Sequence, residues 1–280
     1  MNTPKNWQQL KKTAFDAPLI ELYEADELRA MWLWWLEKKA GIDRSAYLSR
    51  QYDVVTPELA SQLAADVHEL QEGVPFQYVI NEAWFLNRSF VLNRSVLIPR
   101  PETEELVRWI LEEEGSLAEV KLIDLGTGSG IIPISIALAK PHWQVFGLEL
   151  SSEAMVTARE NAQRLGASVQ WLEGDMLAAT LPDWDILVSN PPYIPFAEAD
   201  SLLPRVREQE PAMALFSPDE DPLIFYRSIA NRLRQVAKGK TVYLELNDEK
   251  APEIGGLFDG FDCAFKADMQ GKSRMLRVRS

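Results

Sequence analysis

The chain has few of the residues that build metal centres and covalent crosslinks. Its 280 residues include one cysteine, Cys263, and two histidines, His68 and His142. A single cysteine excludes an internal disulfide and a cysteine-cluster zinc site, because both need several thiolates. Two histidines leave little for a histidine-based metal centre. The sequence therefore predicts a protein that binds no metal.

Long apolar runs and an excess of positive charge are also missing. The most apolar stretch, residues 28–36, contains Arg29 and is too short and too charged to span a membrane. The first residues, MNTPKNWQQLKK, lack the apolar run of a secretory signal, which predicts a cytoplasmic protein. The formal charge of −13 disfavours stable binding to nucleic acid, because such proteins use Lys and Arg to neutralise phosphates. The ordinary apolar fraction of 46% predicts a folded globular chain.

Residues 1–73 carry helical patterns only. Residues 19–40 are apolar on more than one face, as expected of a helix inside a small domain. A second helix is predicted to open at Thr56, a capping residue followed by proline at the first helical position, and to end at Gly73. We therefore expect a small all-helical N-terminal domain over residues 1–73.

The pattern changes over residues 74–99. Aromatic and β-branched residues lie there among short polar breaks that contain asparagine. This pattern is typical of hairpin strands. We therefore expect a β-hairpin linker that joins the N-terminal domain to residues 100–280.

Strand and helix patterns alternate over residues 100–280, after a helix expected at 102–114. Alternation at this spacing predicts βαβ units and a parallel sheet covered on both faces. The last two strand candidates, 261–267 and 274–278, are joined by too short a link for a crossover helix, so they must pair antiparallel. The sequence thus predicts a doubly wound α/β fold. The other strands are expected at 120–125, 143–150, 169–172, 184–189 and 241–246, and the other helices at 131–139, 152–165 and 222–237.

A glycine-rich turn, Asp124-Leu-Gly-Thr-Gly-Ser-Gly, follows an apolar strand and opens an apolar helix, which is the context of a nucleotide-binding turn. A dinucleotide fingerprint would need glycine at the position of Ile131, so a pyrophosphate ligand is disfavoured. S-adenosylmethionine has no phosphate; it needs backbone room for its methionine part and an acid near the turn, for which Asp124 is the candidate. A simple tight turn is the alternative. The expected cofactor-binding residues of the turn are Gly126, Thr127, Gly128, Ser129 and Gly130.

Two further strand ends carry acids. Glu149 ends the strand after the glycine turn, where an acid in nucleoside-binding Rossmann sites accepts hydrogen bonds from the ribose hydroxyls. A solvated glutamate is the alternative, but its coincidence with the glycine turn favours ligand binding. Asp175 and Met176 follow the third strand, and we expect them to contact the adenine.

The motif Asn190-Pro191-Pro192-Tyr193 follows an apolar strand. Two prolines in series cannot continue a sheet and donate no N–H, so they leave rigid carbonyls where ligands of open α/β folds bind. An NH2 group has two donors, which the Asn190 side-chain oxygen and the Pro191 carbonyl can accept. We expect Asn190, Pro191 and Tyr193 to be catalytic, and all four residues, Pro192 included, to bind a planar amide or amine. Asn190 is also expected to touch the cofactor.

Three segments together resemble the HemK/PrmC family of protein-glutamine N5-methyltransferases. They are residues 124–130, residues 190–193 and the segment VLIPRPETEELV at 96–107, which is highly specific to that family. The resemblance covers roughly residues 74–280. It extends to Gln77-Tyr78, Glu210-Pro211, Ala214-Leu215 and Asp268-x-x-Gly271-x-x-Arg274.

The resemblance implies a doubly wound seven-stranded methyltransferase sheet of the Rossmann-like kind and S-adenosyl-L-methionine as cofactor. It implies that residues 100–280 are the methyltransferase domain and that residues 1–73 recognise a protein substrate. The expected methyl acceptor is the side-chain amide nitrogen (N5) of the glutamine in the Gly-Gly-Gln motif of class-1 peptide chain release factors. We expect a monomer. The chain departs from the family pattern at Glu149, where aspartate is frequent, at Met176, where a bulkier aromatic residue is common, and at Pro222, where glycine is usual.

Other functions fit parts of this pattern. An enzyme that methylates an exocyclic adenine or cytosine amine shares the Asn-Pro-Pro-aromatic motif, but it must flip its base and grip a nucleic acid backbone, which the −13 charge disfavours. A non-catalytic module could keep the cofactor fold, yet it would not need an intact motif at residues 190–193. A ribosomal protein glutamine would suit the same active-site residues as a release factor glutamine.

Overall fold

The computed structural model describes residues 5–280 and divides them into two compact units. The first unit comprises residues 5–81 together with Pro204–Gln209, and the second comprises Glu82–Leu203 together with Glu210–Ser280. The boundary near residue 81 lies inside the segment for which we expect a linker. The first four residues of the expected N-terminal domain lie outside the described part of the chain.

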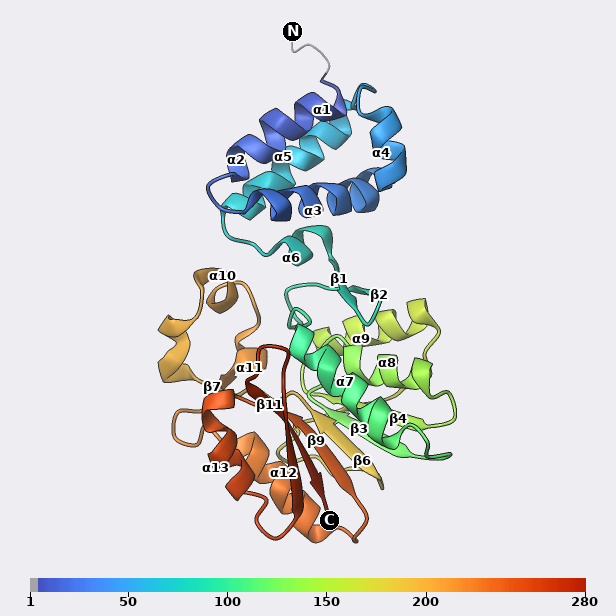
Figure 1. Cartoon of the computed structure of the whole chain (residues 1–280), viewed down its shortest axis with the longest axis vertical. Coiled ribbons are helices and arrows are strands. Elements are labelled where there is room, and N and C mark those ends of the chain that lie inside the picture. Colours follow the sequence, from blue (N-terminus) through green and yellow to red (C-terminus); the bar gives the residue numbers. More distant parts are fainter. Residues whose placement is uncertain (1–4) are drawn as a thin grey trace. The chain divides into compact units, whose positions relative to one another are not determined.

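The first unit is built of helices (Figure 1). The helix predicted over residues 19–40 begins instead at Ala25, because residues 20–22 form a turn. Thr56 caps α5 as predicted, since its hydroxyl oxygen accepts a hydrogen bond from the Leu59 N–H at 3.4 Å. The helices are α1 (Trp7–Leu10), a π-helix (Lys11–Asp16), α2 (Ala17–Leu19), α3 (Ala25–Trp35), a second π-helix (Leu36–Ala40), α4 (Arg44–Arg50), α5 (Pro57–Gln71), α6 (Phe76–Ile80) and α10 (Pro204–Arg207).

Tryptophans form the core of the first unit. The rings of Trp32 and Trp35 are both fully buried and stack with centroids 5.9 Å apart. The indole N–H of Trp35 donates a 2.6 Å hydrogen bond to the buried carboxylate of Asp66 on α5. These residues therefore hold α3 and α5 together through packing and a buried hydrogen bond.

Residues 76–80 differ from the extended segment that we predicted. They form the short helix α6, which follows Pro75 and ends at Asn81 in the left-handed conformation (φ 55°). The hairpin follows directly: β1 (Glu82–Phe85) pairs antiparallel with β2 (Arg88–Val91). Its two-residue turn, Leu86-Asn87, has positive φ at both positions, as the turn that matches strand twist requires.

The second unit is organised around a seven-stranded sheet in the order β10-β11-β9-β6-β3-β4-β5 (Figure 1). The five strands from β9 to β5 in this order run parallel, and β11 lies antiparallel between β9 and β10. The predicted antiparallel pair and the predicted fold class are thus confirmed. The strands are β3 (Lys121–Leu125), β4 (Gln144–Glu149), β5 (Gln170–Glu173), β6 (Ile186–Ser189), β9 (Thr241–Glu245), β10 (Asp262–Ala267) and β11 (Ser273–Arg279).

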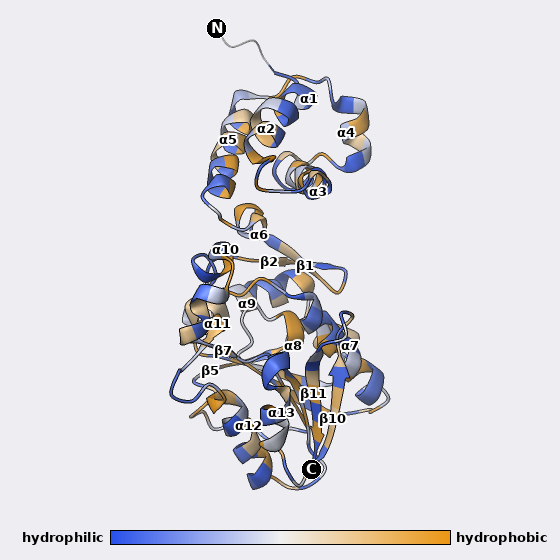
Figure 2. Cartoon of the chain, turned by 60° about the vertical axis from the view of Figure 1, so that its left-hand side comes forward, coloured by the Kyte–Doolittle hydropathy of each residue, from blue (hydrophilic) through white to orange (hydrophobic). Residues whose placement is uncertain are grey.

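Helices cover both faces of this sheet. On β3, Leu122 packs into the core beneath one set of helices and Ile123 into the core beneath the other, as the two-residue period of a strand dictates. Figure 2 shows α8 as an almost wholly apolar helix, in agreement with its burial against the sheet. The first set is α7 (Pro101–Glu114), α8 (Ile131–Ala139) and α9 (Ser152–Leu165), and the second is α12 (Ile224–Gln235) and α13 (Ala251–Gly256).

The carboxyl ends of the central strands meet at one edge of the sheet. Leu125 of β3 pairs with Leu148 of β4 and with Ser189 of β6. The glycine turn, Glu149 and Asn190 follow these three paired residues, so the register brings them to the same edge. Short elements follow Asn190 along the chain: β7 (Ile194–Pro195), a 3-10 helix (Phe196–Ser201), α11 (Ala212–Leu215) and β8 (Phe216–Ser217).

Candidate active site

A cavity of about 370 Å³ opens at the carboxyl edge of the sheet, within the range of about 300–1,000 Å³ typical of small-molecule sites. All of its lining residues belong to the second unit. It brings together most of the residues expected to form the site. Its lining includes Gly126, Thr127, Gly128, Ser129, Glu149, Asp175, Met176, Asn190 and Pro192, together with the segments 94–100 and 211–214.

Two of the three glycines of the turn serve different purposes. All have positive φ, with values of 74° at Gly126, 55° at Gly128 and 80° at Gly130. A Cβ at Gly128 would meet nothing within 4 Å, so this backbone faces open space in the cavity, as a close approach to a ligand requires. A Cβ at Gly130 would lie 2.8 Å from Ile134 Cδ1. Gly130 is therefore needed for packing of the helix, and Gly128 for access to the cavity.

Asp124 lies beneath the turn and does not line the cavity. Its side chain is fully buried, and one carboxylate oxygen accepts a 2.6 Å hydrogen bond from the Thr127 hydroxyl. Burial raises the pKa of Asp124 to about 7, the Thr127 hydrogen bond lowers it, and the charge of Glu149 adds to the rise. The other oxygen, Oδ1, has no hydrogen-bond partner within residues 5–280. Because this oxygen is a buried acceptor without a partner, a hydrogen-bond donor placed next to it would stabilise it.

Glu149 is held by three backbone donors. Its Oε2 accepts from the Gly128 N–H at 2.8 Å, and its Oε1 accepts from the N–H groups of Leu150 and Ser151 at 2.9 Å each. The carboxylate thus bridges the glycine turn and the start of α9, which Ser151 caps. A carboxylate can accept about four hydrogen bonds, so Oε2 keeps capacity toward the cavity that Glu149 lines.

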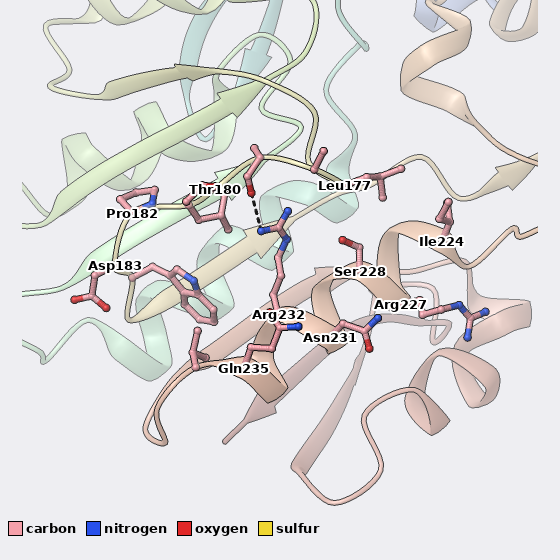
Figure 3. Close-up of a pocket in the computed structure, with 15 residues that line it drawn as sticks. Leu177, Thr180, Pro182, Asp183, Ile224, Arg227, Ser228, Asn231, Arg232 and Gln235 are labelled. Atoms are coloured by element: carbon pink, nitrogen blue, oxygen red, sulfur yellow. Dashed lines mark hydrogen bonds between the residues drawn. The ribbon is translucent and has the colours of Figure 1, made fainter.

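The segment after β5 contributes Asp175 and Met176 to the cavity. Arg232 on α12 holds this segment from behind: it donates hydrogen bonds to the carbonyls of Met176 at 2.9 Å and Ala179 at 2.8 Å. Figure 3 shows the outer side of the same segment, with Arg232 reaching from α12 toward the stretch between Leu177 and Pro182. The cavity wall at Met176 therefore depends on a side chain of α12, which packs in the same core as Met176.

The structure places the four residues of the Asn-Pro-Pro-Tyr motif unequally. Asn190 and Pro192 line the cavity, whereas Pro191 is buried and does not contribute to the lining. Tyr193 is partly buried against the core formed with α12 and does not line the cavity either. Burial, and then the charge of Glu245, raise the pKa of Tyr193 above its ordinary value, so its hydroxyl stays neutral.

Thr103 and Glu245, for which the sequence predicted no role, hold Asn190 in place: Thr103 contacts Asn190, and Glu245 contacts Thr103. The Asn190 amide N–H donates to the Thr103 hydroxyl oxygen at 3.3 Å, and that hydroxyl donates to Glu245 Oε2 at 2.6 Å. Glu245 ends β9 and is only 2% exposed. An acid at the carboxyl end of a buried strand, Thr241–Glu245, was the sequence signal that could have identified it.

Ile98 and Arg100, which line the cavity, are held in place by the buried acid Glu210. Glu210 is 5% exposed, and its Oε1 accepts a 2.6 Å ion-paired hydrogen bond from Arg100. Its Oε2 accepts from the Ile98 N–H at 3.2 Å. Two motifs that enter only through the family resemblance, 96–107 and Glu210-Pro211, thus meet at the cavity.

No cluster of three or more His, Cys, Asp or Glu side chains suited to a metal ion occurs within residues 5–280. Over the same residues, none of the helices has the length and apolar character needed to cross a membrane.

The chain matches two described families. Residues 103–204 match the methyltransferase small domain, and residues 20–80 match the PrmC N-terminal domain. Among solved structures, the catalytic domain of hMettl16 is similar in fold alone, with 16% identity, a TM-score of 0.53, and coverage of 78% of this chain and 80% of that chain.

Curated relatives agree with these matches. The release factor glutamine methyltransferase of Flavobacterium psychrophilum is 37% identical over 219 residues, covering 75% of this chain and 77% of that protein. The protein of the same name from Bacillus anthracis is 37% identical over 245 residues, covering 84% and 86%. The predicted resemblance and the predicted assignment as an S-adenosylmethionine-dependent methyltransferase are confirmed. The chain belongs to the release factor glutamine methyltransferase family.

Proposed function

We propose that this chain transfers a methyl group from S-adenosyl-L-methionine to the side-chain amide nitrogen of the glutamine in the Gly-Gly-Gln motif of class-1 release factors. One observation carries the proposal: Asn190 lines the same cavity as the glycine turn and Glu149. A site for a nucleoside-type cofactor and an acceptor for an amide NH2 therefore share one enclosed space. The names of the relatives from F. psychrophilum and B. anthracis support the choice of substrate.

The cavity fits the cofactor by its chemistry. Gly128 offers bare backbone on the cavity side, and Glu149 offers acceptor capacity for the ribose hydroxyls. Asp124, beneath the turn, supports the site indirectly, because its carboxylate accepts a 2.6 Å hydrogen bond from Thr127, which lines the cavity. Met176, whose sulfur would lie 3.9 Å from a Cβ built on Gly126, gives the cavity an apolar side chain that suits a planar ring. S-adenosylmethionine supplies a methyl group that is already activated by its sulfonium.

The protein has to hold the acceptor nitrogen in line with that methyl group. A glutamine amide nitrogen is a weak nucleophile because its lone pair is delocalised into the carbonyl. The Asn190 side-chain oxygen and the Pro191 carbonyl would accept its two N–H bonds, which orients the nitrogen and lowers the entropic part of the barrier. As positive charge develops on the nitrogen, both acceptors bind it more strongly, so they stabilise the transition state more than the ground state.

Tyr193 is proposed to support the glutamine side chain. The ring packs against the core next to Asn190 and Pro192, and burial keeps its hydroxyl neutral. A rigid, uncharged aromatic face at this position would pack on a planar amide when the substrate enters.

We further propose that residues 1–73 recognise the protein substrate, that residues 74–99 link the domains while residues 94–99 also line the cavity, and that residues 100–280 carry catalysis. The described residues of the first stretch form a separate helical unit, and the lining of the cavity begins only at Arg94. Because the smaller unit does not line the cavity, we assign to it the contacts with parts of the release factor other than the Gly-Gly-Gln motif.

The test is transfer of labelled methyl groups from S-adenosylmethionine to three acceptors side by side: a class-1 release factor, ribosomal protein and DNA. We expect label on the release factor only, and none on a variant whose Gly-Gly-Gln glutamine is replaced by alanine. Label on DNA would support a base amine as substrate instead, and label persisting on the alanine variant would contradict the assigned glutamine.

A further inference from the structure

Glu245 is a buried acid that the proposed chemistry does not use. It ends β9, the strand that pairs in parallel with β6, and Asn190 follows β6 directly. Glu245 and Thr103 are each only 2% exposed. An acid removed from water in this way costs stability unless its oxygens accept hydrogen bonds, and the Thr103 hydroxyl meets that need at 2.6 Å.

The hydroxyl of Thr103 joins Glu245 to Asn190. A hydroxyl has one proton to donate and two lone pairs with which to accept. Because Thr103 donates its proton to the Glu245 carboxylate, it can only accept from Asn190, and it does so from the Asn190 NH2 at 3.3 Å. The amide group of Asn190 therefore presents its nitrogen to Thr103 and leaves its oxygen free.

The orientation of this amide decides what Asn190 can hold. An amide rotated by a half-turn would present NH2 where its oxygen now lies, and NH2 cannot accept from the NH2 of a substrate. If Thr103 were free to donate, the Asn190 oxygen would be an equally good partner for it. A carboxylate behind Thr103 removes that alternative, because it accepts only.

We propose that Glu245 is a positioning residue which, through Thr103, fixes the amide orientation of Asn190 and thereby the acceptor that holds the substrate nitrogen. The inference rests on the proposed function, since it specifies how the same site is kept ready for an NH2 group. It adds two residues, one on α7 and one on β9, to the acceptor pair at residues 190 and 191.

The surroundings of Glu245 make this restraint dependent on pH. Burial raises the pKa of Glu245 to about 7, the Thr103 hydrogen bond lowers it, and the charge of Glu102 adds to the rise. Below this pKa the protonated acid can donate to Thr103, which frees the threonine proton for the Asn190 oxygen. Turnover should therefore fall as pH drops through about 7. The titratable and charged groups that face Glu245 are Arg100, Glu102, Tyr193, Tyr226 and Arg274.

The test uses the full-length enzyme with S-adenosylmethionine and intact release factor, and compares Thr103→Val, Thr103→Ser and Glu245→Gln. Thr103→Val keeps the shape but removes the link, so kcat should fall roughly tenfold to a hundredfold, as for a misplaced catalytic group. Thr103→Ser restores the hydroxyl and should recover most of kcat. In Glu245→Gln the amide can accept or donate, so kcat should fall less and the decline below pH 7 should vanish.

Thr103 lines the cavity, but the backbone donors that hold Glu149 and the glycine turn are unchanged in all three variants, so cofactor affinity, measured by calorimetry, should change much less than kcat. The pH profile is measured as kcat at saturating cofactor, because Asp124 beneath the glycine turn also has a pKa of about 7. Wild-type kcat in Thr103→Val, or an unchanged decline of this kcat below pH 7 in Glu245→Gln, would overturn the inference. If Glu245→Gln does not fold, the pair of threonine variants carries the test. The proposed function fails separately, if the unaltered enzyme leaves the release factor unlabelled.

Discussion

The two sides of the cavity are held in place by different kinds of hydrogen bond. On the cofactor side, Glu149 accepts three backbone N–H groups, from residues that are near it in sequence or on the adjoining turn. On the substrate side, Asn190 is held by the Thr103 side chain, which is held in turn by Glu245. Single side-chain changes cannot remove backbone donors. The position of Glu149 is therefore robust to changes of neighbouring side chains, whereas the orientation of Asn190 depends on both Thr103 and Glu245.

The largest effect should come from Asn190→Ala. Removal of an acceptor that strengthens in the transition state should lower kcat by roughly a hundredfold or more. Cofactor affinity should change much less, because the glycine turn and Glu149 are untouched. Steady-state kinetics and calorimetry on the same preparation separate the two quantities. A kcat close to that of the unaltered enzyme would show that the substrate side does not work through Asn190.

The matching change on the cofactor side is Glu149→Ala. Loss of its hydrogen bonds should weaken S-adenosylmethionine binding by about 1–3 kcal/mol, the range for hydrogen bonds to a charged group. The free Gly128 N–H should also lower the melting temperature of the cofactor-free protein. Glu173→Ala is the matched control, since Glu173 ends the next strand with a side chain 64% exposed. Unchanged calorimetric affinity in Glu149→Ala would rule out the ribose contact.

A smaller effect is expected from Arg232→Ala, which acts on the cavity wall from outside. Without its two hydrogen bonds the segment from Met176 to Ala179 should lose its fixed position, and cofactor affinity should fall by about 1 kcal/mol. At saturating cofactor kcat should be kept. Arg227→Ala on the same helix is the control, because Arg227 pairs with Asp221 at the surface. Equal cofactor affinities in the two variants would show that Arg232 has no role in the site.

The smallest effect concerns the first unit. Ile20 and Leu48 are 67% and 65% exposed there, and each can contribute apolar contact to a protein partner. Ile20→Asn combined with Leu48→Asn should raise KM for intact release factor by a few fold, on the order of 1 kcal/mol. KM for a short Gly-Gly-Gln peptide should stay the same. Val156→Asn, at an exposed site of the second unit, is the control; a KM that rises equally for peptide and protein would contradict a recognition role of the first unit.

Local signals predicted most of the second unit correctly. Helices α8 and α9 have the predicted bounds, because local residues set their starts: α8 follows Gly130 in the left-handed conformation, and the Ser151 side chain caps α9. The five residues of α6 were predicted as extended instead. A short apolar run fits a strand or a helix equally well, and here Pro75 and the left-handed Asn81 set the ends of a helical turn.

The cofactor residues could be predicted in part. Glu149 and the glycine turn were expected at the site, because strand ends and glycine spacing are local features. The complete burial of Asp124 and the position of Tyr193 against the core could not be seen in the sequence, since both depend on how neighbouring elements pack over the strand ends. The role of Arg232 likewise depends on α12 lying beside the segment after β5.

The sequence by itself determined the succession of strands and helices, the sharp turn at residues 126–130 and the rigid motif at residues 190–193. Periodicity, glycine and proline act within a few residues, so they need no knowledge of the rest of the chain. Only the tertiary structure decided that Thr103, Asn190 and Glu245 meet. They come from three distant parts of the chain, and their contact requires β6 to pair with β9 and α7 to pack across that pair. The order of the strands follows from the need to bury both faces of one sheet at the same time. A local sequence pattern shows where a strand lies in the chain, but it does not show which strands will be its neighbours.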